Sequence, residues 1–118
     1  MMTFEAWLDC ILDAARNISS LEFQRKAWFP GGSEVSSPEE TYQVLMEDCT
    51  ADLFFETYGR RFTEEQMRSW FRLRSSLEGY YDKLSAHPDP NQVLYDPNWD
   101  LVRQSAEEFV RAFVPYKT

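Results

Sequence analysis

Residues 36–59 read SSPEETYQVLMEDCTADLFFETYG and carry the clearest helical signal of the chain. Ser37 is a typical N-cap, Pro38 occupies the first helical position, and Glu40 completes a capping box. Apolar residues then recur at the spacing of one helix face, at Tyr42, Leu45, Met46, Cys49 and Leu53. The stretch therefore predicts one continuous amphipathic helix over residues 38–58.

The same helical spacing continues on both sides of this stretch. Further helices are predicted over residues 3–18, 20–29, 64–84 and 97–114. In the helix over 64–84, the inward face is expected to carry Met67, Trp70, Phe71, Leu77, Tyr81 and Leu84. Two Asp-Pro pairs, at Asp89 and Asp96, favour a helical turn between them.

No alternating apolar pattern and no Asn-Gly or Asp-Gly hairpin turn competes with these helices. The sequence therefore predicts a single all-α domain over residues 1–118. Its expected architecture is an irregular bundle of four main helices plus one or two short helices.

Composition narrows the classes of function. The 118 residues are 43% hydrophobic and 16% aromatic, which is sufficient for a stable core, and the net charge is −8. That charge disfavours binding to nucleic acid or to an anionic membrane, because both require a basic surface. The N-terminus lacks a basic region and no apolar run approaches 18 residues, so neither a signal peptide nor a transmembrane helix is expected. We expect a cytoplasmic protein.

The residues needed for common catalytic sites are scarce. Cys10 and Cys49 form no CxxC motif and are expected to be two buried, reduced thiols. The single histidine, His87, follows no nucleophile pattern and lies in a proline-rich connector. Neither a metal site built on His or Cys nor a cofactor is expected.

Carboxylates are the one catalytic resource in abundance. The all-α nucleotide pyrophosphohydrolases hold Mg²⁺ with a Glu-Glu-x-x-Glu run, which Glu39 and Glu40 begin. Gln43, however, stands where the third acid is needed, and the second acidic pair is missing from the helix that follows. The sequence therefore favours a non-enzymatic protein, with this hydrolase class as the weakest alternative.

Residues 33–59 contain seven acids and no base. Asp48, Asp52 and Glu56 follow one another at i, i+4 spacing, a repulsion that costs a helix a few tenths of a kcal/mol per pair. Either this row is a solvated face, with Arg74 of the next helix as the best internal partner, or it binds a basic partner. The aromatic residues nearby favour a partner surface. Its expected members are Glu34, Glu40, Glu47, Asp48, Asp52, Phe55, Glu56 and Tyr58.

Three short patterns carry a resemblance over residues 21–113. They are Phe23-Gln24-Arg25 with Trp28, Gly-x-Glu-Val-Ser-Ser from Gly32, and Asp96-Pro97-x-Trp99. In these the chain resembles small acidic bacterial immunity proteins of contact-dependent inhibition and polymorphic toxin systems. The resemblance implies a cytosolic inhibitor that binds one cognate toxin domain. Many such toxins are nucleases with basic clefts, which an acidic partner can occupy. The alternative is an adaptor or regulatory module without a toxin partner.

Overall fold

The computed structural model describes residues 2–29, 36–84 and 88–114, and within these ranges every regular element is helical. The order along the chain is α1 (Phe4–Ser19), α2 (Leu21–Ala27), α3 (Pro38–Gln43), the π-helix η1 (Val44–Asp48), α4 (Ala51–Tyr58), the short 3₁₀ helix η2 (Gly59–Arg61), α5 (Glu64–Tyr81), α6 (Pro90–Leu94) and α7 (Pro97–Ala112). The predicted all-α fold is confirmed. The short helix α6 lies between the two Asp-Pro pairs, as the sequence predicts.

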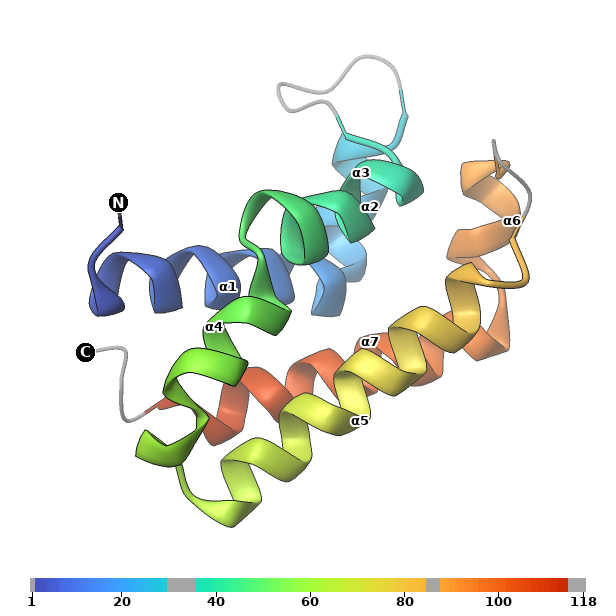
Figure 1. Cartoon of the computed structure of the whole chain (residues 1–118). Coiled ribbons are helices and arrows are strands. Elements are labelled where there is room, and N and C mark those ends of the chain that lie inside the picture. Colours follow the sequence, from blue (N-terminus) through green and yellow to red (C-terminus); the bar gives the residue numbers. More distant parts are fainter. Residues whose placement is uncertain (1, 30–35, 85–87, 115–118) are drawn as a thin grey trace.

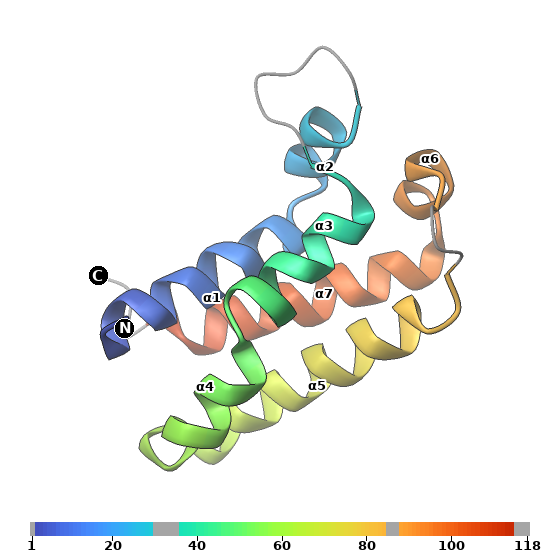
Figure 2. The ribbon, with the colours of Figure 1, turned by 45° about the horizontal axis from the view of Figure 1, so that its top comes forward.

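Helix α7 forms the centre of the molecule, with α1 along one side and α5 along the other (Figures 1 and 2). Its buried residues are Trp99, Val102, Ala106 and Phe109, followed by Phe113. These positions repeat every three or four residues, so α7 buries one apolar stripe along its length.

The segment α3–η1–α4 crosses over α1 and α5 on one side of this three-helix layer (Figure 1). Aromatic contacts attach α4, at the end of this segment, to the layer. Phe55 stacks on Trp70 of α5 at 4.6 Å between ring centres and also contacts Phe109 of α7 at 5.9 Å. Such ring pairs each contribute about 0.5–1.5 kcal/mol beyond the area they bury. Helix α4 is therefore fastened to the core by its aromatic residues.

A buried polar network joins α2 to α1 and α7. Gln24 is 0% exposed, and its Nε2 donates to the carbonyl oxygens of Asn17 and Ile18 at 3.0 and 2.8 Å. Its Oε1 accepts from the indole Nε1 of Trp99 at 2.9 Å. Every polar atom of the Gln24 side chain thus has a partner, as a buried amide requires. Gln24 and Trp99, which belong to the short patterns quoted above, therefore have a structural role in the core.

The predicted continuous helix over residues 38–58 is wrong, because it is interrupted at Cys49 and Thr50. The amide of Cys49 donates to the carbonyl of Val44, five residues back, at 2.8 Å. Thr50 then adopts the left-handed conformation, with φ 46° and ψ 53°. Together these changes rotate α4 relative to α3, which leaves Leu53 53% exposed and turns Phe54 and Phe55 inward.

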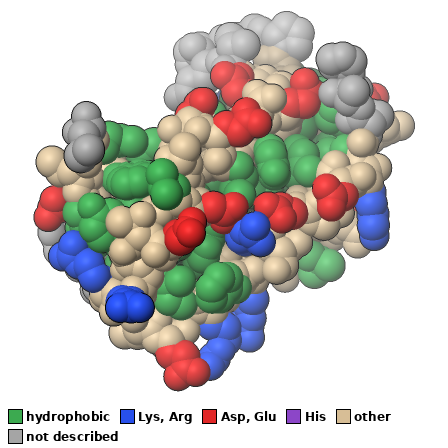
Figure 3. Space-filling model, viewed as in Figure 1, with side chains coloured by type: hydrophobic (Ala, Val, Ile, Leu, Met, Phe, Trp, Pro, Cys, Tyr) green, Lys and Arg blue, Asp and Glu red, His purple; other side chains and the backbone are tan. Residues whose placement is uncertain are grey.

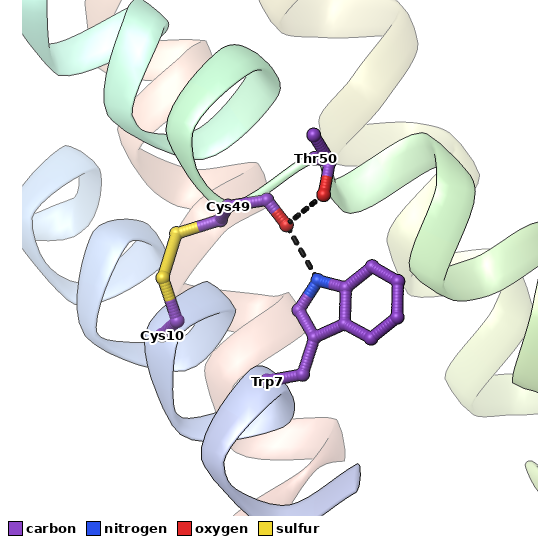
Figure 4. Close-up of a disulfide and its surroundings, with 4 residues drawn as sticks. All are labelled: Trp7, Cys10, Cys49 and Thr50. Carbon is purple, nitrogen blue, oxygen red and sulfur yellow. Dashed lines mark hydrogen bonds between the residues drawn. A yellow bond between two sulfur atoms is a disulfide. The ribbon is translucent and has the colours of Figure 1, made fainter. Parts of the chain in front are cut away.

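Cys10 and Cys49 form a disulfide, so the prediction of two reduced thiols is wrong (Figure 4). The two residues are 39 apart in the sequence, but η1 packs on α1 and brings their Cα atoms to 5.9 Å, within the usual range for a disulfide. The spacing of two cysteines in a sequence does not show which helices will touch. The pairing therefore depends on tertiary contacts that periodicity does not encode.

The buried stripe of α5 differs from its prediction: Gln66, Ser69 and Leu73 are buried, whereas Met67, Tyr81 and Leu84 are only partly buried. Phe71 is 56% exposed, and Leu73 is fully buried in its place beside Trp70 and Leu77. Because α5 packs against α7, its stripe follows the side that faces α7, and Phe71 falls outside it.

Among the residues that the structure describes, no helix combines the length and the apolar character needed to cross a bilayer.

Candidate functional site

Acidic side chains gather on the side of the molecule where η1 and α4 meet α5. Figure 3 shows them as a row across the middle of this side, interrupted by a basic group. The charges of four of them act on Tyr42: Glu47, Asp52, Glu78 and Asp82. Burial raises the pKa of Tyr42, and the charges of these four carboxylates raise it further. We call Glu47, Asp52, Glu56, Glu78 and Asp82 the acidic face.

Two members of the acidic face, Glu78 and Asp82, come from the end of α5 and were not among the predicted site residues. The rings of Tyr42 and Tyr81 lie 4.7 Å apart, and the hydroxyl of Tyr81 donates to the carbonyl oxygen of Pro38. These contacts place the end of α5 beside the start of α3, which makes the two segments antiparallel. The place of Glu78 and Asp82 in the acidic face therefore follows from the register between the two segments.

Asp52 is neutralised within the fold. Its Oδ1 accepts a hydrogen bond from Nε of Arg74 at 2.7 Å, and a second nitrogen of Arg74 lies 3.6 Å from Glu78. The hydrogen bond and charge of Asp52 raise the pKa of Arg74. Arg74 is therefore the internal partner that the sequence suggests. That Asp52 also contacts a partner stays a prediction.

The other acids predicted for the surface have a different environment. Glu40, Glu47, Asp48 and Glu56 are exposed, and none of them forms an ion pair within the described part of the chain. No base among the described residues thus lies within ion-pair distance of these four carboxylates. Glu34 lies outside the described residues.

The predicted aromatic anchors are largely inside the molecule. Phe55 is 5% exposed, so the expectation that it extends beyond the core face is wrong. Tyr58 is half-buried, with its ring 5.1 Å from that of Phe4 and 5.2 Å from that of Phe54. The rotation of α4 at Thr50 is the physical reason, because it directs this face of α4 toward α1 and α7.

A groove of about 390 Å³ between α4 and α5 lies beside the acidic face. It is lined by Asp52, Phe55, Glu56, Trp70, Phe71 and Arg74. The stacked rings of Phe55 and Trp70 are buried and form its base, whereas Phe71 is exposed. The groove thus offers an apolar interior with a carboxylate, that of Glu56, that has no ion-pair partner among the described residues.

The carboxylates considered for a magnesium site are not brought together. Among the residues that the structure describes, no three His, Cys, Asp or Glu side chains form a group able to hold a metal ion. Glu39 and Glu40 lie in the first turn of α3, and Glu64 and Glu65 lie in the first turn of α5. His87 lies outside the described residues.

Comparison with protein-family models, with curated proteins and with solved structures found no match for this chain.

Proposed function

We propose that this chain is a non-enzymatic immunity-type protein that binds and neutralises a cognate bacterial toxin domain in the cytoplasm. The proposed partner is a basic, nuclease-like domain, and no cofactor takes part. The observation that carries the proposal is the acidic face beside the α4–α5 groove. Two of its members, Glu47 and Glu56, are exposed and have no ion pair among the described residues.

The charge on this face favours fast association with a basic partner. Complementary potentials steer two proteins together and raise the association rate, an effect that falls as salt screens the charges beyond roughly 8 Å. Asp52 contributes little, because Arg74 already balances it. Glu47, Asp48 and Glu56 are the acids that act at long range.

The α4–α5 groove supports a specific contact within that surface. A long side chain with an apolar stem and a cationic head matches its lining, since the stem covers Phe71 and the head reaches the carboxylate of Glu56. Lysine and arginine have this shape. In the proposed complex, one basic residue of the toxin domain occupies the groove, and Phe71 replaces Phe55 as the aromatic contact.

Association kinetics with a purified toxin domain test the proposal. A candidate partner is the C-terminal domain of any large secreted protein whose gene lies beside the gene for this chain. We expect a 1:1 complex whose association rate falls with added salt. Glu47→Lys is expected to lower that rate roughly three- to tenfold. Glu65→Lys is the matched control, because Glu65 is exposed, lines a pocket between α5 and α7 instead of the α4–α5 groove, and makes the same change in net charge.

Two results contradict the proposal. One is the absence of a complex with any such domain, and the other is a complex in which Glu47→Lys and Glu65→Lys bind alike. A complex that forms without blocking the activity of the toxin supports the adaptor alternative. Mg²⁺-dependent hydrolysis of nucleotides that is lost in Glu39→Gln supports the hydrolase alternative.

A further inference from the structure

The Cys10–Cys49 disulfide is attached to the most irregular point of the backbone. It joins the middle of α1 to the residue that follows η1, and Thr50 is the next residue (Figure 4). Cys49 is 0% exposed, whereas Cys10 is partly exposed on α1. Of the two residues, Cys10 is therefore the more exposed.

The hydrogen bonds around Cys49 show how the helix is interrupted. In a regular α-helix its carbonyl oxygen accepts from the amide four residues later. Here that oxygen accepts from the indole Nε1 of Trp7 at 2.6 Å and from the hydroxyl of Thr50 at 2.8 Å (Figure 4). Helix α1 thus holds the junction at two points, through the disulfide and through Trp7.

Local preferences oppose this junction. A threonine in the left-handed conformation costs about 1–3 kcal/mol, because its branched side chain meets the backbone. The apolar spacing over residues 38–58 also favours a helix that continues through Cys49. The junction is therefore maintained by its bonds to α1, and loss of the covalent bond leaves the hydrogen bond of Trp7 and the packing of α4 to oppose the strain.

We propose that Cys10–Cys49 is a reversible redox site that sets the geometry of the η1–α4 junction. Its substrate is a dithiol reductant. One thiolate of the reductant attacks Sγ of Cys10, the disulfide breaks, and the electron pair leaves on Sγ of Cys49, which takes up a proton. The second thiolate then attacks the mixed disulfide, which releases Cys10 as a thiol and leaves the reductant as a disulfide. Two electrons and two protons are transferred to the protein.

Attack at Cys10 follows from its exposure, since thiol exchange requires access to the sulfur. Disulfides in the cytosol of mesophiles are typically transient or redox-sensing. A reversible Cys10–Cys49 bond is therefore consistent with the proposed cytoplasmic location. Its effect on binding rests on the proposed function: Glu47 precedes the junction and Glu56 follows it, so the redox state sets how these two acids are placed relative to each other.

Amide hydrogen exchange of the full chain, with and without dithiothreitol, tests the site without any partner. Reduction without denaturant is expected to raise the exchange rates of residues 44–53 by about tenfold or more, while those of residues 102–109 in α7 stay unchanged. A pair that dithiothreitol does not reduce without denaturant overturns the proposal. Unchanged exchange at the junction after reduction overturns it as well, and so does an equal rise throughout α7.

Two variants separate redox control from simple cross-linking. Cys10→Ser with Cys49→Ser is expected to reproduce the reduced pattern and to ignore dithiothreitol. Thr50→Gly removes the cost of the left-handed conformation, so its junction should respond to reduction less than that of the wild type. A Thr50→Gly chain that responds as fully as the wild type contradicts the role of strain.

Binding to the toxin domain in both redox states then separates this inference from the proposed function. A junction that responds to dithiothreitol in a protein that binds no toxin domain leaves the redox site intact and refutes the proposed function. A complex whose kinetics are the same in both states, despite a changed junction, refutes only the link between the redox site and binding.

Discussion

The layer formed by α1, α7 and α5 and the segment α3–η1–α4 follow different rules. In the layer, helix bounds and most buried residues agree with the periodicity of the sequence, because each helix buries the stripe that its own spacing creates. In the crossing segment, the same periodicity predicts Leu53 inside, whereas the structure buries Phe54 and Phe55. Bonds to a distant helix decide the conformation there. The comparison shows that local pattern prevails only where no long-range bond opposes it.

The largest effect is expected at Phe55, which the structure buries although the periodicity places Leu53 inside. Phe55→Ala removes a buried ring from the aromatic cluster and should lower the free energy of unfolding by about 3–5 kcal/mol. Leu53→Ala is the matched control and should cost less than about 1 kcal/mol, because Leu53 is exposed. Chemical denaturation measures both. The opposite order of the two variants would show that the continuous helix is the correct conformation.

Loss of the disulfide should have the next largest effect. Cys10→Ala with Cys49→Ala frees a loop of 39 residues and should lower the free energy of unfolding by about 2–4 kcal/mol. The unfolded chain gains most of this freedom, so the helical content of the folded state should remain nearly the same. Denaturation monitored by circular dichroism measures the loss. A double variant as stable as the wild type would mean that the pair is not bonded in the folded protein.

The contact of Tyr81 with α3 should make the free energy of unfolding depend on pH under alkaline conditions. Burial raises the pKa of Tyr81, so above pH 10 the unfolded chain loses this proton while the folded protein retains it. Stability is thus constant below that pH and falls above it, by up to about 1.4 kcal/mol per pH unit. Melting curves of the wild type and of Tyr81→Phe between pH 9 and 11 measure the difference. Equal slopes would exclude Tyr81 as a source of this dependence.

The smallest expected effect concerns the paired and unpaired acids of the crossing segment. Asp52→Lys breaks the contact with Arg74 and should lower the free energy of unfolding by up to about 1 kcal/mol, since the pair is partly exposed. Asp48→Lys should change it by only a few tenths, because Asp48 has no ion pair among the described residues. Thermal melts at low salt compare them. Similar losses for both would indicate a base near Asp48 in solution.

The fold class and the approximate bounds of α1, α5 and α7 follow from the sequence, because capping residues and apolar spacing are local signals. The residues of the candidate site can be predicted only in part from such local signals. Arg74 was identified as a partner from its place near the apolar stripe, but Glu78 and Asp82 required the register between two segments. The backbone conformation at Cys49 and Thr50 could not be predicted from the sequence. The π-turn and the left-handed residue depend on bonds to Cys10 and Trp7, about 40 residues away.

The position of α7 also bears on how the protein is made. Helix α1 buries its apolar face largely against α7, and Trp99 supplies the hydrogen bond that Gln24 needs. About 80 residues separate the end of α1 from the start of α7, which at 5–20 residues per second delays their meeting by roughly 4–16 s during synthesis. Over that interval the first helix emerges without its main partner. The growing chain therefore completes this core only when α7 has been translated.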